Sequence, residues 1–286
     1  MNTIKYFLQF FIIFFLFIIF KILGLKLASN FSSWLLKIFG PFFRSKKIIE
    51  KNILKAFPTI NHKDLKKIIT DMWGNYGRIL SEYVFLKNFR GSQFKDNLEI
   101  VGQDFLEEIK KEGKPVIFIS GHFNNFELMA MHIEKSGVDL AVIYRPLNNK
   151  FLNLTMEKIR KKYICKYQIK KGIAGTRQLL SFFKTNHSIA LMIDQRVSQG
   201  IKSNFFKQAA YTTTIPAQFV KKFNCKVVPI YIERINKINF KLTISKPLKY
   251  SNEKTLEDIT LDLNQIIEKM ILKNPEQWIW SHNRWK

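Results

Sequence analysis

The N-terminal stretch carries hydrophobic positions with almost no polar interruption. Residues 6–20 read YFLQFFIIFFLFIIF, in which Gln9 is the one strongly polar residue, and Lys5 and Lys21 bound the run. With the residues that follow, the apolar stretch reaches about 20 residues, enough to cross the hydrocarbon core of a bilayer. As a core helix it would need complete burial, because it has no polar face. We therefore predict a membrane anchor helix at residues 1–25, either spanning the bilayer or lying shallowly in it.

A cleaved signal peptide is the alternative for this segment. Its cleavage site would require small residues soon after the apolar run, and Lys21 and Lys26 stand there instead. A set of basic residues follows the anchor: Lys37, Arg44, Lys46, Lys47 and Lys51. By the positive-inside rule, these residues place the rest of the chain in the cytoplasm.

Residues 26–95 form a basic segment with a helical pattern. An apolar set recurs there at helical spacing: Phe31, Trp34, Leu35, Ile38 and Phe39. The spacing fits two arrangements equally, a membrane-proximal helix along the bilayer surface and an amphipathic helix packed on the domain. Asn61, with Asp64 three residues later, predicts the start of a further helix.

Beyond residue 98, short apolar runs alternate with helical stretches. The runs NLEIVG, PVIFIS, VDLAVIY, SIALMID and KVVPIYIE predict strands, and INFKLTIS predicts an antiparallel edge strand. Alternation of this kind is typical of βα units in a largely parallel sheet. A last helix is expected across residues 254–273. We therefore predict the α/β class: a largely parallel central sheet flanked by helices, in one domain over residues 96–286, behind the N-terminal membrane-anchor helix.

Composition narrows the class of protein. The 286 residues are 47% hydrophobic and include 27 Phe and 5 Trp, which excludes a disordered chain. The net charge is +25, but 38 of the 47 basic residues are Lys, a bias that AT-rich coding produces by itself. Even so, the surface should attract nucleic acid, an anionic membrane or an acidic protein. Cys165 and Cys225 have no CxxC spacing, which argues against zinc and disulfides and fits a reducing compartment.

One predicted strand end carries candidate chemistry. PVIFIS runs into Gly121 and His122, and Glu127 falls in the first turns of the next helix, which Asn124 or Asn125 can cap. In open α/β sheets, ligands gather where strands end. The Glu127 carboxylate can accept the ring N–H of His122 and fix its tautomer, which makes His122 a general base. No Ser or Cys is placed as a covalent nucleophile, so direct activation of a substrate hydroxyl is the expected chemistry.

Four blocks in order resemble one enzyme family. GHFNNFE, IYRPLNN, SIALMIDQR and the terminal PEQWIWSHNRWK together resemble the lipid A secondary acyltransferases of Gram-negative bacteria, the lauroyl and myristoyl transferases of the lysophospholipid acyltransferase superfamily. The resemblance covers most of the chain. One departure is Lys207 in SNFFKQAAYTTT, where the family usually has Gly, and it concerns the backbone of that loop.

The resemblance implies a reaction and its partners. Such an enzyme moves a fatty acyl group from acyl carrier protein to a hydroxyl of a Kdo-bearing lipid A precursor. His122 would take the proton from that hydroxyl and Glu127 would hold His122, with no cofactor and no metal. The protein would reside in the bacterial inner membrane, with its catalytic domain on the cytoplasmic face. The acyl carrier protein thioester, the anionic glycolipid acceptor and the membrane would be its partners, and nucleic acid would not.

Four further residues are candidates for binding substrate. Arg145 and Arg160 stand out in a chain that otherwise prefers Lys, and an arginine offers a planar fork to phosphate or carboxylate. Asp194 and Gln195 end the SIALMID strand on the sheet edge expected for His122, where they would line the acceptor pocket or cap the loop.

Two alternative functions remain open on the sequence. The basic GxxG of residues 170–175 resembles the phosphate clamp of a KH domain, which would suggest a nucleic-acid-binding protein. An acyltransferase acting on a phospholipid, mannolipid or ornithine lipid would also use a His-x4-acid pair. For a phospholipid enzyme, Gly175-Thr176-Arg177 lacks the Pro-Glu that usually precedes this sequence.

Overall fold

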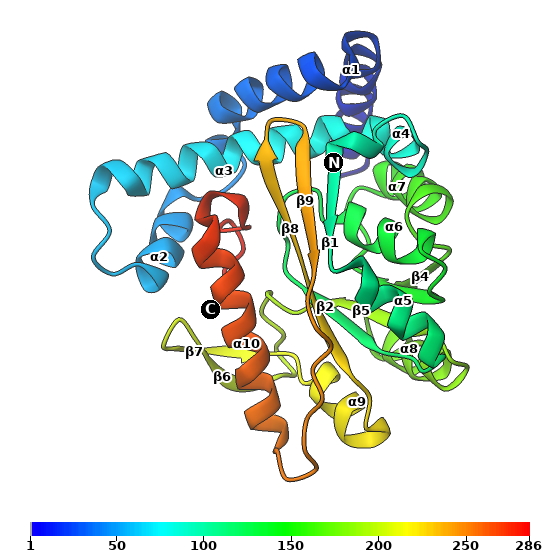
Figure 1. Ribbon diagram of the computed structural model, residues 1–286. Coiled ribbons are helices and arrows are strands. Elements are labelled where there is room, and N and C mark those ends of the chain that lie inside the picture. Colours follow the sequence, from blue (N-terminus) through cyan, green and yellow to red (C-terminus); the bar gives the residue numbers. More distant parts are fainter. Residues whose placement is uncertain (1) are drawn as a thin grey trace.

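The computed structural model describes residues 2–286, and its centre is a seven-stranded sheet (Figure 1). The strands lie in the order β1 (Leu98–Val101), β9 (Asn239–Ile244), β8 (Val227–Asn236), β2 (Ile117–Ser120), β5 (Ser188–Met192), β3 (Leu140–Tyr144) and β4 (Tyr167–Lys170). The pair β8–β9 is antiparallel, and every other neighbouring pair is parallel. The predicted class, a largely parallel α/β sheet, is therefore confirmed.

Strand β9 is antiparallel as predicted, but it is not the edge of the sheet. Strand β1 pairs with its outer side, from Leu98 opposite Phe240 to Val101 opposite Thr243. Strand β9 alternates buried and less buried residues, which indicates one face on the core but says nothing about its two edges. The prediction of an edge strand was wrong because β1, which comes much earlier in the sequence, pairs with the outer side of β9.

Helices pack around the sheet and bury it. Their bounds are α5 (Gln103–Glu112), α6 (Glu127–Lys135), α7 (Lys150–Tyr163), α8 (Ile173–Lys184), α9 (Ile215–Phe223) and α10 (Leu256–Lys273). All four residues of the central strand β2 are buried, as expected for a strand covered on both faces. Full burial of one large apolar side chain stabilises a folded protein by about 1.5–3 kcal/mol. The buried side chains between the sheet and its helices therefore make the sheet a rigid base for the loops at its edge.

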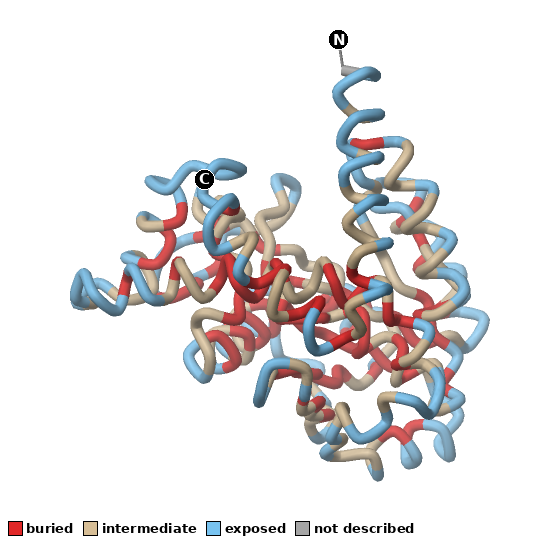
Figure 2. The backbone as a smooth tube through the Cα atoms, turned by 90° about the horizontal axis from the view of Figure 1, so that it is seen from above, coloured by how far each residue is buried: buried red, intermediate tan, exposed pale blue. Residues whose placement is uncertain are grey.

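The first helix, α1 (Asn2–Phe39), consists of two helical parts. Gly24 interrupts it with φ +72° and ψ 166°, a left-handed backbone that favours glycine. The first part projects from the body of the protein (Figure 2), and only 11% of the most apolar 18-residue stretch of the whole helix is buried. The helix is long and apolar enough to cross a membrane.

The second part of α1 lies on α3 (His62–Glu82), which connects to α2 (Lys46–Ala56) before it and α4 (Leu86–Arg90) after it (Figure 1). The two helices approach closely at Gly77, where a Cβ would lie 2.0 Å from the carbonyl oxygen of Ser32. The Ser32 hydroxyl donates to the Gly77 carbonyl at 2.6 Å. Asn61 caps α3 by accepting from the amide of Asp64, as predicted. The opposite face of α1 exposes apolar side chains: Leu27, Trp34, Ile38 and Phe39. This part of the chain therefore both packs on the domain and presents an apolar face.

A short hairpin lies in a segment where the sequence pattern indicates no strand. Strands β6 (Ile201–Phe205) and β7 (Gln208–Thr212) pair in antiparallel fashion around Phe206 and Lys207. These two turn residues have φ values of +52° and +58°, the pattern of a two-residue type I′ turn. The turn explains why glycine suits position 207, because an L side chain in this region is strained.

We predict that Lys207→Gly stabilises the protein. Glycine removes the strain of a left-handed backbone, which stabilises the folded state. It also raises the entropy of the unfolded chain, which offsets part of this gain. The free energy of unfolding should therefore rise by about 0.5–1 kcal/mol. Thermal unfolding of the detergent-solubilised protein measures the change. Lys202→Gly, within strand β6 of the same hairpin, is the matched control and should lower stability by about 1 kcal/mol. Equal losses for both variants would contradict the turn assignment.

Candidate active site

Four adjacent parallel strands deliver polar residues to one edge of the sheet. Strands β2, β5, β3 and β4 are neighbours in that order, and just beyond their carboxyl ends stand His122, Asp194, Arg145 and Lys171. The carboxyl edge of an open parallel sheet is where α/β proteins bind ligands. The prediction that Asp194 and His122 share an edge is therefore confirmed.

His122 is held by Asp194 through two hydrogen bonds. The imidazole Nδ1 lies 2.8 Å from one carboxylate oxygen, and the backbone amide of His122 donates to the other at 2.8 Å. Gly121 makes this approach possible, since a Cβ there would lie 2.8 Å from the Phe123 ring and 3.2 Å from the Asp194 carboxylate. The side chain of His122 is 23% exposed and that of Asp194 is fully buried. With Nδ1–H donated to the carboxylate, Nε2 is the nitrogen that can accept a proton from a substrate.

The indole of Trp278 is the third donor to Asp194, at 2.7 Å. Burial by itself raises the pKa of the Asp194 carboxyl. The charge and hydrogen bonds of His122 and the bond from Trp278 outweigh burial and lower its pKa to about 2. Asp194 is therefore ionised at neutral pH and presents its negative charge to the His122 ring.

Glu127 has different partners from the predicted one. It is the first residue of α6, and its carboxylate binds Arg160 of α7, with Nε at 2.7 Å and Nη2 at 2.6 Å. The Tyr83 hydroxyl donates to the same carboxylate and accepts from Arg160 at 3.0 Å. Within residues 2–286, His122 shares no hydrogen bond with Glu127, so the contact that we expected between them is replaced by the one to Asp194. A buried carboxylate gains more from a guanidinium than from a neutral imidazole.

Burial and charge both act on this second cluster. Burial raises the pKa of the Tyr83 hydroxyl, and the negative charge of Glu127 raises it further. For Arg160, burial lowers the pKa, but Glu127 and Tyr83 outweigh burial and raise it. Arg160 therefore keeps its positive charge beside Glu127, with Tyr83 as a neutral donor. No sequence signal marked Tyr83, which lies far from the His-x4-acid block.

The two asparagines after His122 do not cap α6 with their side chains. The helix has no side-chain cap, and Asn124 instead donates to the carbonyl of Ile232 at 3.0 Å and to Gln277 at 2.6 Å. Its φ of +42° turns the chain between strand and helix. Asn124 thus joins the His122 loop to β8 and to the C-terminal segment.

The positive side of the site lies at the ends of β3 and β4. The amide of Lys171 donates to the carbonyl of Tyr144, so Lys171 and the exposed Arg145 follow paired strand ends. Burial and the nearby charge of Arg145 lower the pKa of Lys171. Gln195 is partly exposed beside Asp194. Across residues 2–286 no group of three His, Cys, Asp or Glu side chains is placed to hold a metal ion.

The C-terminal segment packs against the site. His282 accepts the amide of Arg196 at 3.1 Å. Burial lowers its pKa to about 4, against the opposing effect of the Asp194 charge, so His282 is neutral. The side chain of Asn52 in α2 donates to the carbonyls of Trp280 and His282 at 2.8 and 2.7 Å. The hydrogen bond from Trp278 to Asp194 was not foreseen, because its partner is 84 residues away.

An α/β fold with a carboxylate-held histidine at the carboxyl edge of its sheet, behind an apolar N-terminal helix, fits a membrane-associated acyltransferase. The chain belongs to the bacterial lipid A biosynthesis acyltransferase family, whose model matches residues 1–286. A lipid acceptor follows from that membership, and the apolar helix agrees with membrane association.

Curated relatives agree with the family. A "Lipid A biosynthesis acyltransferase" of Haemophilus influenzae is 24% identical over 246 residues, 85% of this chain and 78% of the relative. The "Lipid A biosynthesis palmitoleoyltransferase" of Escherichia coli K12 is 22% identical over 252 residues, 86% of this chain and 80% of the relative. The "Lipid A biosynthesis lauroyltransferase" of the same organism is 21% identical over 252 residues, 85% of this chain and 79% of the relative.

We predict that Glu127→Gln costs stability through Arg160. The variant leaves a buried guanidinium without a counter-charge, which should lower the free energy of unfolding by about 3 kcal/mol. Denaturant unfolding in detergent measures the loss. The double variant Glu127→Leu/Arg160→Met removes both charges and should recover most of it. A double variant as unstable as the single one would contradict the ion pair as the cause.

Proposed function

We propose that the protein transfers a fatty acyl group from an acyl carrier protein thioester to a hydroxyl of a Kdo-bearing lipid A precursor. Family membership supports acyl transfer to a lipid. The proposal adds the carrier-protein donor, the glycolipid acceptor and the catalytic base. The enzyme would work at the bacterial inner membrane, with its catalytic domain on the cytoplasmic face.

His122 is the proposed general base, and its contact with Asp194 is the observation that carries the proposal. Nε2 takes the proton of the acceptor hydroxyl while the oxygen attacks the thioester carbonyl carbon. The tetrahedral intermediate collapses, the carbon–sulfur bond breaks, and the imidazolium returns the proton to the leaving thiolate. Asp194 keeps Nδ1 protonated and stabilises the imidazolium between these steps. In this mechanism Asp194 takes over the orienting role that the sequence suggested for Glu127.

Glu127 then acts through Arg160 and Tyr83. The three buried groups fix α7 against the start of α6, the helix that follows His122. Because the guanidinium of Arg160 is engaged there, the oxyanion of the intermediate is left to amides at the start of α6. Glu127 and Arg160 are thus proposed as positioning residues.

Arg145 and Lys171 are proposed to bind the anionic part of the acceptor. Both are cations at the sheet edge that carries His122, and an anion between them relieves their mutual repulsion. Phosphates and carboxylates of a glycolipid supply such an anion. The apolar first part of α1 holds the enzyme where the acyl chains of the acceptor lie. Gln195, next to Asp194, would line the same pocket.

We predict that His122→Ala abolishes acyl transfer and that Asp194→Asn lowers kcat by about 10²–10⁴, because the imidazole loses its tautomer control. Membrane-bound enzyme, acyl carrier protein thioesters of varied chain length and the tetra-acylated precursor are incubated together, and product masses report both acceptor and acyl chain. Membrane association should persist in both variants, since the anchor is a separate element. Substantial turnover by His122→Ala would refute the general base, and acylation of a phospholipid but not of the precursor would identify the other acceptor class.

A second kinetic prediction concerns the Arg145 side chain. Arg145→Lys keeps the charge but loses the bidentate fork, so the KM for the acceptor should rise about tenfold. Initial rates with varied acceptor at saturating donor measure it. Arg177→Lys, at an exposed position on α8, is the matched control and should leave the KM unchanged. Identical kinetics for both variants would remove Arg145 from the site.

A further inference from the structure

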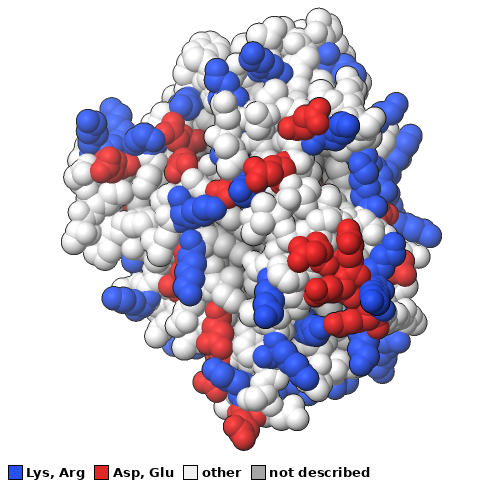
Figure 3. Space-filling view, in the orientation of Figure 1, with Lys and Arg blue, Asp and Glu red and all other residues white. Residues whose placement is uncertain are grey.

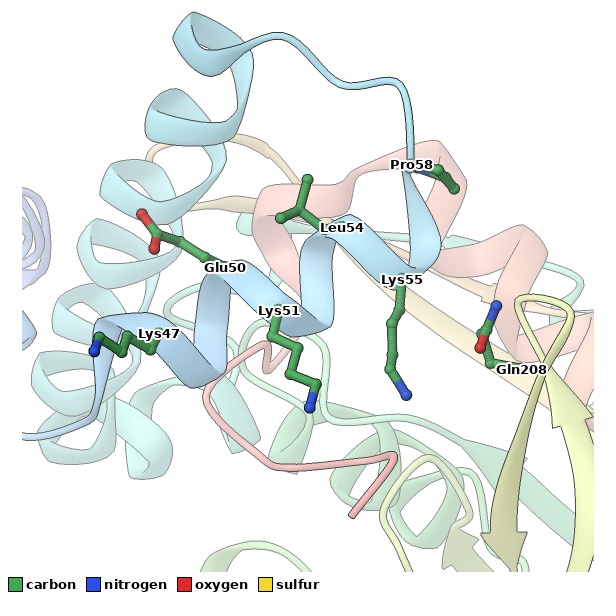
Figure 4. A pocket seen from close by; sticks show the side chains of 7 residues that line it. All are labelled: Lys47, Glu50, Lys51, Leu54, Lys55, Pro58 and Gln208. Atoms are coloured by element: carbon green, nitrogen blue, oxygen red, sulfur yellow. The ribbon is translucent and has the colours of Figure 1, made fainter.

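A wide groove on α2 lies outside the residues of the proposed mechanism. Its volume is about 590 Å³, and it runs between α2 and the hairpin residue Gln208 (Figure 4). The lining residues are Lys47, Glu50, Lys51, Leu54, Lys55, Pro58 and Gln208. Lysine is the dominant side chain of the lining, so the groove is an electropositive concavity.

The three lysines form one row along the helix. Lys47, Lys51 and Lys55 follow at intervals of four residues, which places them on one face over about 12 Å. None of the three has an ion-pair partner within residues 2–286, whereas Lys46 pairs with Glu50. Figure 4 shows Glu50 directed away from Lys51 and Lys55, which extend to the same side of the helix. The row is therefore free to meet a row of negative charges.

The groove adjoins the segment that supports the catalytic histidine. The Lys55 ammonium lies 5.6 Å from the centre of the Trp285 ring. The buried side of the same helix is fixed by Asn52 to the carbonyls of Trp280 and His282, two and four residues after Trp278, which binds Asp194. A partner in the groove is thus docked beside the segment that lies on the site.

The composition of the groove favours an acidic protein over the anionic leaflet. Aromatic side chains suited to a membrane interface lie elsewhere, on α1 and just after it, where Trp34, Phe42 and Phe43 are 57%, 83% and 70% exposed. The groove itself offers Leu54 as its one large aliphatic side chain.

We infer that the α2 groove is the docking surface for the acidic acyl carrier protein that delivers the thioester. Lys47, Lys51 and Lys55 pair with carboxylates on one helix of the carrier, and the acyl-bearing arm reaches past the C-terminal segment to His122. Complementary charge rows of this kind set the association rate and the orientation of a transient complex. The inference rests on the proposed donor and adds the place where that donor binds.

Charge reversal of the row tests the surface. In the full-length detergent-solubilised enzyme, Lys47→Glu/Lys51→Glu/Lys55→Glu should raise both the Kd for fluorescently labelled acyl carrier protein and the KM for its acyl thioester at least tenfold. The kcat should stay unchanged, and the salt dependence of Kd should weaken. The corresponding Lys→Gln triple variant should raise Kd and KM in the same direction but by less. It tests the same surface if the charge-reversed variant fails to fold.

The matched control carries the same change of charge at the opposite edge of the sheet. Lys114, Lys184 and Lys222 are exposed and precede β2, β5 and β8, so their reversal to Glu should leave Kd and KM within about twofold of the wild type. Equal effects of the two reversals, or loss of binding to anionic vesicles without loss of carrier binding, would overturn the docking surface alone. A wild-type enzyme that neither binds the carrier nor uses its thioester would overturn the proposed donor, and the docking surface with it.

Discussion

The buried carboxylate of Asp194 is the group on which the organisation of the site depends. It accepts from the ring and the backbone amide of His122 and from the indole of Trp278, so one side chain joins the β2 loop, the end of β5 and the C-terminal segment. A fully buried charge is costly without such donors. The fold therefore forms the site only when all three segments are in place, which makes the C-terminal segment part of the site's structure rather than a tail.

The second buried charge connects the α/β part of the chain with its N-terminal helices. Tyr83 directly follows the last residue of α3, and it shares Glu127 with Arg160 of α7. Next to it, Glu82 pairs with Arg234 of β8 at 2.5 Å in another buried ion pair. Consecutive residues at this helix end thus bind two sides of the α/β domain. Helix α3, which also packs against α1, is therefore held on the α/β domain by charge as well as by packing.

The sequence predicted those features of the fold that depend on the local pattern of apolar and polar residues. Apolar runs marked the central strands, and since parallel strands share their carboxyl edge, the pattern of strands was enough to place His122 and Asp194 together. Strand β4 was not expected, because Tyr167–Lys170 contains one buried residue and no apolar run. The β6–β7 hairpin was not expected either, because Phe206 and Lys207 stand where glycine or asparagine marks a type I′ turn.

The partner of Glu127 was misassigned for a different reason. A spacing of five residues limits which side chains can meet but does not decide which do. Tyr83 and Arg160 lie 44 and 33 residues away, and only the packing of α3 and α7 brings them to the carboxylate. Where a buried carboxylate can reach either a guanidinium or an imidazole, it pairs with the guanidinium, because burial strengthens the attraction between full charges.

The net charge of +25 is easier to interpret once the positions of the charged side chains are known. On the face shown in Figure 3, basic side chains are scattered, while acidic ones gather over α5. Scattered surface charges are screened beyond about 8 Å at physiological salt, so they attract acidic surfaces without selecting among them. Selection requires cations fixed in a geometry that a ligand matches. We propose this role for two sets of cations, Arg145 with Lys171 at the sheet edge for the acceptor and the lysine row on α2 for the donor.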